Sequence, residues 1–229
     1  MFGRARENGR RTVCLSNQRQ ILVALQLYES DSAENFPYVV DAIAEESWIN
    51  RLLPYVQAPA VFLCPTDGDV AEKASTGFTT FSSGVKNVVV PSSYIVNKRL
   101  LYEGRIVIDP GHRLVASSRP VATVTSPSTT VFISDGVVQA FPEPPYWTAD
   151  SQVGCAAGGA LYGYQLDEPS QSHDSVVIEP GAIYNDCYAP NSRHLGRVNV
   201  GFVDGHVKSM SLAQWYFPNT PFLDPAKGG

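Results

Sequence analysis

The side chains best suited to chemistry lie close together near the C-terminus of the chain. His194 is followed after nine residues by Asp204-Gly205, and His206 comes next. Imidazole and carboxylate groups are frequent ligands of transition metals, so His194, Asp204 and His206 predict a metal site with two histidines and one carboxylate. Two structural interpretations remain open. Asp204 is an ordinary residue for a hairpin turn, and His194 braces the loop before the strand.

Other segments offer weaker candidates for chemistry. Asp67-Gly68-Asp69 and Asp135-Gly136 are acidic turns whose oxygens suit calcium, although turn formation alone also explains them. Calcium or another divalent metal is therefore the candidate cofactor, and none is certain. Ser134-Asp135 near a histidine would suit a hydrolase, but the motifs G-x-S-x-G and H-E-x-x-H do not occur. We expect a protein without enzymatic activity.

A β-hairpin must position the two histidines. Val198, Val200 and Phe202 alternate with residues 199, 201 and 203, which predicts a strand with these two sets on opposite faces. Asp204-Gly205 predicts a two-residue turn with positive φ at both central positions. Residues 206–210 then return as the partner strand.

An amphipathic helix is predicted over residues 12–30. Its apolar stripe has helical spacing and consists of Cys14, Gln18, Ile21, Leu25 and Tyr28 together with Leu15, Leu22, Val23 and Leu27. A second, short helix is predicted from Ser47 to Val56. Strands are predicted at 87–90, 94–96, 105–108, 121–124, 130–134 and 175–178, besides the two of the hairpin. These elements predict an α+β fold, with the long helix laid across an antiparallel sheet.

Composition limits the class of protein. Hydrophobic residues make up 44% and charged residues 17% of the 229 residues, and glycine and proline are frequent, at 18 and 17. Such a chain favours short strands and many turns over a helical bundle. The net charge of −5 gives no support for a nucleic-acid partner.

Four cysteines without metal-ligand spacing predict two disulfides and an oxidising compartment. The favoured pairing joins Cys14 to Cys64 and Cys155 to Cys187, while the sequence leaves three pairings open. Four buried free thiols are the alternative.

Residues 141–191 differ from the rest, because prolines and glycines alternate there with aromatic residues. We expect a loop-rich insertion closed by the second disulfide. If exposed, its aromatic side chains would form a contact surface; if buried, they would form the core of the insertion. The candidates are Tyr146, Trp147, Tyr162, Tyr164 and Tyr184. Residues 192–216 form the C-terminal hairpin region, and 217–229 are expected to be a frayed tail of the same single domain, 1–229.

Four segments in order along the chain resemble a known family. The spacing of His194 and Asp204-Gly205 resembles the prepilin-type family with a C-terminal His-x9-Asp-Gly motif, a relative of type II secretion pseudopilins and type IV pilins. Three further blocks are similar to the same family: Ala5 to Tyr28, Trp48 to Asp67 with its Phe62-Leu63-Cys64-Pro65-Thr66-Asp67, and Ser126 to Gly136.

The resemblance implies a pilin-like head whose residues 1–30 correspond to the C-terminal half of the pilin helix. It implies a hydrophobic helix of about twenty residues before Phe2, so we expect the intact protein to be anchored in a membrane. The implied location is the periplasmic or extracellular face of the cell envelope, with other pilin-like subunits as partners in a homo- or hetero-oligomer. A subunit of a filament or secretion apparatus is the main hypothesis. A surface module that binds a ligand, polysaccharide or metal through the insertion is the alternative, followed by a metal-dependent hydrolase.

Overall fold

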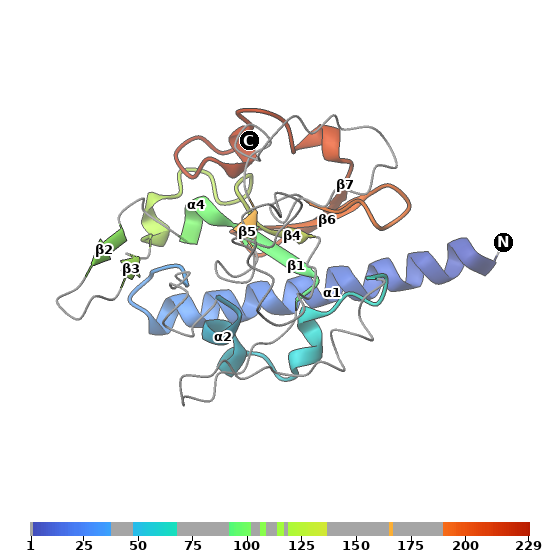
Figure 1. Ribbon diagram of the computed structural model, residues 1–229, viewed down its shortest axis with the longest axis horizontal. Coiled ribbons are helices and arrows are strands. Elements are labelled where there is room, and N and C mark those ends of the chain that lie inside the picture. Colours follow the sequence, from blue (N-terminus) through green and yellow to red (C-terminus); the bar gives the residue numbers. More distant parts are fainter. Residues whose placement is uncertain are drawn as a thin grey trace, which may run out of the picture.

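The computed structural model describes residues 2–37, 48–67, 92–101, 106–108, 114–116, 119–136, 165–166 and 190–229 (Figure 1). A long N-terminal helix, α1 (Phe2–Asp31), packs on a sheet whose four main strands are antiparallel. The predicted α+β class, with a long helix on an antiparallel sheet, is confirmed.

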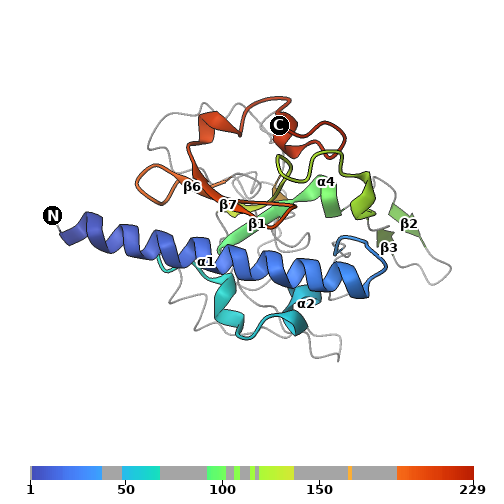
Figure 2. The same cartoon turned by 180° about the vertical axis from the view of Figure 1, so that it is seen from behind.

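Helix α1 begins ten residues earlier than predicted, and its first part projects beyond the rest of the described chain (Figures 1 and 2). Burial starts at Cys14 and recurs at three- and four-residue intervals as far as Tyr28. Two members of the predicted stripe were misplaced, because Val23 and Leu27 are 50% and 49% exposed. They lie on the side of the helix that faces away from the core.

The sheet has the strand order β5-β1-β4-β6-β7. Its strands are β1 (Tyr94–Asn97), β4 (Val131–Asp135), β5 (Gln165–Leu166), β6 (Val198–Phe202) and β7 (Val207–Met210). The pairs β1–β4, β4–β6 and β6–β7 are antiparallel, as predicted for the sheet. The two-residue β5 pairs with β1 in parallel at the edge of the sheet. Because β1, β4 and β6 are buried along their whole length, both faces of the sheet are covered.

Two layers cover the sheet. On one face α1 comes so close to β6 that a Cβ added at Gly201 would lie 2.6 Å from Ile133 Cγ2 and 2.8 Å from Leu22 Cδ1. On the other face, Val200 and Phe202 pack with Trp215 and Tyr216, among other residues, in a second apolar cluster. The predicted alternation of β6 is therefore confirmed, with Val198, Val200 and Phe202 sharing the face away from α1.

The β6–β7 turn differs from the predicted two-residue turn. Phe202 N donates to His206 O and Gly205 N donates to Phe202 O, so the loop comprises Val203, Asp204 and Gly205. Of these three, Gly205 alone has a positive φ, of +92°. This is the three-residue hairpin loop in which a turn is followed by one left-handed residue. As a result, His206 lies opposite Phe202.

A third layer lies on the side of α1 opposite the sheet (Figure 2). It consists of helix α2 (Trp48–Leu52) and the 3-10 turns η1 (Leu53–Tyr55) and η2 (Pro59–Phe62). The predicted helix at 47–56 is thus present but shorter, because the 3-10 turn η1, which contains Pro54, begins at Leu53. Trp48 and Phe62 are fully buried with an edge-to-face contact, their ring centroids 5.8 Å apart.

The remaining described elements are short. They are α4 (Lys98–Leu101), the β2–β3 pair (Ile106–Ile108 and Leu114–Ala116), and the 3-10 turns η3 (Val121–Thr123), η5 (Leu212–Gln214) and η6 (Pro221–Leu223). The strand predicted at 121–124 was wrong, since this segment is η3. Predicted strands 87–90 and 175–178 lie outside the described residues.

The C-terminal segment 217–229 packs against the rest of the fold, so the prediction of a frayed tail was wrong. Thr220 and Leu223 are buried, Leu223 O accepts a hydrogen bond from Asn97 Nδ2 at 3.2 Å, and Pro225 O accepts one from Thr125 N at 2.9 Å. Most of the insertion, including its predicted aromatic contact residues and Cys155 and Cys187, lies outside the described residues.

Candidate functional site

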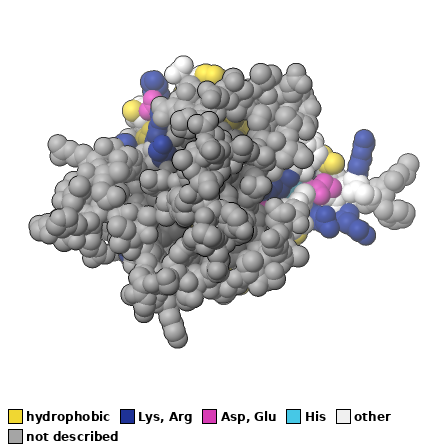
Figure 3. Space-filling view, in the orientation of Figure 1, with side chains coloured by type: hydrophobic (Ala, Val, Ile, Leu, Met, Phe, Trp, Pro, Cys, Tyr) yellow, Lys and Arg dark blue, Asp and Glu magenta, His cyan; other side chains and the backbone are white. Residues whose placement is uncertain are grey.

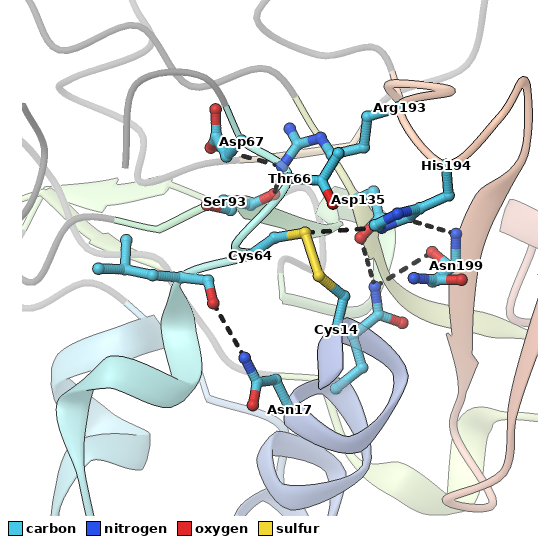
Figure 4. Close-up of a disulfide and its surroundings, with 12 residues drawn as sticks. Cys14, Asn17, Cys64, Thr66, Asp67, Ser93, Asp135, Arg193, His194 and Asn199 are labelled. Carbon is cyan, nitrogen blue, oxygen red and sulfur yellow. Dashed lines mark hydrogen bonds and ion pairs between the residues drawn. A yellow bond between two sulfur atoms is a disulfide. The ribbon is translucent and has the colours of Figure 1, made fainter. Parts of the chain in front are cut away.

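A buried disulfide joins α1 to the segment after η2. Cys14 and Cys64 are both fully buried, with Cα atoms 5.2 Å apart, which is the ordinary distance for a disulfide. The predicted Cys14–Cys64 pairing is confirmed. Asn17 Nδ2 reinforces this connection by donating to Leu63 O at 2.9 Å (Figure 4).

His194 lies beside this disulfide with no exposed surface (Figure 4). Its Nε2 is 3.5 Å from Cys64 Sγ and 3.4 Å from Asp135 Oδ2. Its Nδ1 is 2.9 Å from Glu7 Oε1, and the same oxygen accepts a hydrogen bond from Thr66 Oγ1 at 2.9 Å. Both ring nitrogens therefore face a carboxylate, one from the helix and one from the sheet.

Asp135 ends β4 and is also fully buried. Its Oδ1 accepts a hydrogen bond from Gln18 Nε2 at 3.1 Å, and its Oδ2 accepts one from Asn199 N at 2.7 Å. Burial raises the pKa of Asp135 to about 6, against the opposing influence of Arg193, His194 and these hydrogen bonds. The Asp135-Gly136 pair is thus the end of a buried strand rather than the open acidic turn that was predicted.

Arg193 closes the cluster on the sheet side. Its Nη1 is 3.4 Å from Asp67 Oδ2, and the two side chains are only 7% and 8% exposed. The guanidinium also donates to the carbonyl oxygens of Ser93 and Gly136. Asp67 is therefore paired with a buried cation, whereas Gly68 and Asp69 of the candidate calcium turn lie outside the described residues.

The predicted metal ligands do not form one site. Asp204 Oδ1 and His206 Nδ1 are paired at 2.5 Å at the hairpin tip, where the His206 ring stacks on Phe202 with centroids 4.2 Å apart. His194 lies before the other end of β6, and a five-residue strand spans about 16 Å. The nine residues between His194 and Asp204 therefore contain β6 and the turns at its two ends, and they hold His194 far from His206.

The structure instead brings together a different set of possible ligands. Cys14, Cys64 and His194 each offer a ligand atom within 4.8 Å of the other two, and all three residues are buried. The sequence predicted the Cys14–Cys64 pair and placed Gln18 in the apolar stripe of the helix, but it did not connect His194 with the cysteines or give Glu7 a role. The signal that could have connected them is that each lies in one of the four segments carrying the family resemblance.

Those four segments converge on the disulfide (Figure 4). The helix contributes Cys14, the block after η2 contributes Cys64, the end of β4 contributes Asp135, and the loop before β6 contributes His194. We call this set, with Glu7, Gln18, Asp67, Arg193 and Asn199, the disulfide cluster. Its burial makes it a structural junction between α1 and the sheet.

Comparison with known proteins gives a partial match. Residues 3–63 match a family model described as a protein of unknown function (DUF1559), and the match covers slightly more than a quarter of the chain. It includes α1 and Phe62-Leu63, whereas the His194 and Asp204 motif lies outside it. No curated protein and no solved structure gives a significant match. Among the described helices, none combines the length and apolar character needed to cross a bilayer.

The buried carboxyl of Asp135 predicts a pH dependence of stability. Its folded-state pKa of about 6 exceeds the unfolded value near 3.8, so the folded protein binds the extra proton. This contribution to stability is present below about pH 4 and is lost as the pH rises to about 6. The loss is on the order of 3 kcal/mol. In urea unfolding at pH 4, 5, 6 and 7, Asp135→Asn should have a shallower decline than the wild type. Equal slopes would contradict the prediction.

Proposed function

We propose that the protein is a non-enzymatic, pilin-like subunit of a cell-envelope filament or secretion apparatus. The observation that carries this proposal is the outer face of α1, which no other described element covers. Three of the five large apolar side chains exposed among the described residues lie on it, Val13, Val23 and Leu27, each about half exposed. A solvated helix face ordinarily carries charged and polar groups there.

The exposed apolar residues belong to a regular pattern. Uncharged, exposed residues recur at alternating four- and three-residue intervals along α1, and we call this row the outer seam: Gly9, Val13, Ser16, Gln20, Val23 and Leu27. This is the spacing at which helices pack side by side. Small residues at Gly9 and Ser16 would let a neighbouring helix approach closely.

The charges of the projecting part lie off this seam. Arg4, Arg6 and Arg10 are exposed, and the basic side chains of the projecting end are visible in Figure 3. At 100° per residue, Gly9 and Leu27 point in the same direction, whereas the three arginines point at least 60° away from it. The outer seam thus offers an uncharged surface for the helix of another subunit, bordered by cationic groups.

Three further observations support the proposal. The α+β architecture, with a long helix projecting from a head, has the form expected of a pilin-like subunit. The family match covers this helix and the layer beside it. The Cys14–Cys64 disulfide suits an oxidising location such as the periplasmic or extracellular face of the envelope. A membrane anchor in the intact protein and other pilin-like subunits as partners are part of the same proposal.

The absence of enzymatic activity is also proposed. His194 and Asp135, the imidazole–carboxyl pair of the disulfide cluster, are fully buried and engaged with protein groups. A catalytic group must reach its substrate within hydrogen-bond distance, so this burial argues against a hydrolase in the cluster.

Site-directed cross-linking tests the proposal in cells that produce the full protein. Gln20→Cys places a thiol in the outer seam, and Ala213→Cys places one in exposed η5 on the other side of the sheet. With a short bis-maleimide, Gln20→Cys should yield dimers and higher species on a denaturing gel, while Ala213→Cys and the wild type remain monomeric. A monomeric Gln20→Cys, or equal cross-linking of both variants, would contradict assembly through α1.

A further inference from the structure

Part of the disulfide cluster has the dimensions of a tetrahedral metal site. Cys14, Cys64 and His194 offer ligand atoms within 4.8 Å of one another, and Asp135 joins this set through its contact with His194. Bonds of about 2.3 Å to sulfur and 2.0 Å to nitrogen or oxygen place a sulfur and a nitrogen ligand about 3.5 Å apart, and a nitrogen and an oxygen ligand about 3.3 Å apart. The structure has 3.5 Å between Cys64 Sγ and His194 Nε2. It has 3.4 Å between His194 Nε2 and Asp135 Oδ2. Cys14 Sγ lies within 4.8 Å of both the other sulfur and the imidazole.

The groups around these four residues have the arrangement of a second coordination shell. A metal-bound histidine generally donates its other ring N–H to a carboxylate, which fixes its orientation. His194 Nδ1 has this partner in Glu7 at 2.9 Å. The Asp135 carboxylate is oriented in the same way by Gln18 and by the backbone N–H of Asn199.

Contacts other than the disulfide hold the two cysteines near each other. Asn17 of α1 bonds to Leu63 O, one residue before Cys64, and Thr66 bonds to Glu7 of α1. On the other side, Ser93 N donates to Phe62 O at 2.8 Å. When the S–S bond is reduced, these contacts keep the thiols of Cys14 and Cys64 close to each other. Side-chain rotation then opens the sulfurs to the roughly 3.8 Å that tetrahedral zinc requires.

We infer that the reduced protein binds one Zn²⁺ ion through four buried ligands: Cys14, Cys64, His194 and Asp135. Two thiolates, one imidazole and one carboxylate in tetrahedral array favour zinc among the common divalent ions. With a neutral imidazole the site carries one net negative charge. The buried guanidinium of Arg193, which is also paired with Asp67, acts electrostatically on Asp135 and favours its charged form.

The disulfide and the zinc complex exclude each other, because both use the same two sulfurs. Oxidation joins the two thiolates and passes two electrons to an acceptor such as a small-molecule disulfide. The S–S bond of the acceptor breaks, the acceptor takes up two protons from solvent to become two thiols, and the Zn²⁺ ion is released. Reduction by a dithiol reverses these steps. The cluster therefore has two cross-linked forms, one covalent and one metal-bound.

Cobalt and zinc titrations of the full chain test this inference. The protein is reduced with a phosphine, freed of metal and titrated with Co²⁺, whose absorption reports tetrahedral geometry and thiolate ligands. Zinc is then added in competition, and bound metal is measured by mass spectrometry. We expect one ion per chain in the reduced protein and none in the oxidised protein.

Variants assign the ligands. Cys14→Ala/Cys64→Ala should abolish the cobalt–thiolate absorption, and Asp135→Asn should weaken zinc binding about tenfold or more. His206→Ala, at the hairpin tip, is the matched control for His194→Ala and should retain full binding. If Cys14→Ala/Cys64→Ala or His194→Ala binds as the wild type does, the inference is wrong.

The folded state of the reduced protein is followed by circular dichroism in the same samples. If the metal-free reduced chain loses helix, Zn²⁺ should restore it, because metal binding then supplies folding free energy. A reduced wild type that neither binds Zn²⁺ stoichiometrically nor regains helix with it would overturn the inference.

Discussion

Replacing both Cys14 and Cys64 by alanine should lower the free energy of unfolding by about 4 kcal/mol. The disulfide closes a loop with a sequence separation of 50, so its removal gives the unfolded chain many more conformations. The bridge also ties α1 to the layer that holds η2, within a fully buried setting. Urea unfolding followed by circular dichroism, with a metal chelator present, measures the effect.

The double variant separates this bridge from any contribution of Cys155 and Cys187. Reductant should destabilise the wild type by at least the loss seen in the variant, and any further effect of reductant on the variant then belongs to the other two cysteines. A variant within about 1 kcal/mol of the wild type would show that the bridge does not support the fold.

His194→Ala should cost about 3 to 5 kcal/mol, even with the disulfide intact. The substitution removes the imidazole that lies between Glu7 and Asp135, and it leaves a cavity beside the fully buried Cys64. The buried Asp135 then loses the interaction with His194 that helps to lower its pKa. Thermal and urea unfolding at pH 7 measure the loss.

His206→Ala is the matched control, since it removes the other histidine of the predicted metal site. His206 is about one-third exposed and contacts Asp204 and Phe202 at the hairpin tip, so we expect a loss below about 1 kcal/mol. Equal losses in the two variants would contradict the assignment of His194 as the structural histidine of the motif.

Local patterns predicted much of the fold. The four-residue spacing from Cys14 to Gln18 and from Ile21 to Leu25 identifies the buried side of α1, and the alternation of β6 identifies both of its faces. The prediction of secondary structure was wrong where side-chain type alone does not decide the backbone conformation. The valines of 121–124 suit a strand, but Pro120 precedes a 3-10 turn there. Val23 and Leu27 of the outer seam are likewise apolar but exposed, so hydrophobicity alone placed them on the buried side.

The candidate site could be predicted only in part, because its contacts join distant parts of the chain. Gln18 and Asp135 are 117 residues apart, and Glu7 and His194 are 187 residues apart. Spacing along the sequence grouped His194 with Asp204 and His206, whereas the extended β6 holds them at opposite ends. The Cys14–Cys64 pairing could be predicted, since the helix and the segment that contains Cys64 follow each other in the chain.

The ribosome synthesises the residues of the disulfide cluster in the order of the sequence. Cys14 and Cys64 are both made in the first third of the chain, and His194 follows Cys64 by 130 residues. At about 5 to 20 residues per second, this delay is about 6 to 26 s. During that interval the helix and its neighbouring layer can become linked while the strand and loop that later enclose them do not yet exist. In an oxidising compartment the two thiols can therefore be joined before the sheet is complete, and completion of the sheet afterwards seals the bond away from solvent.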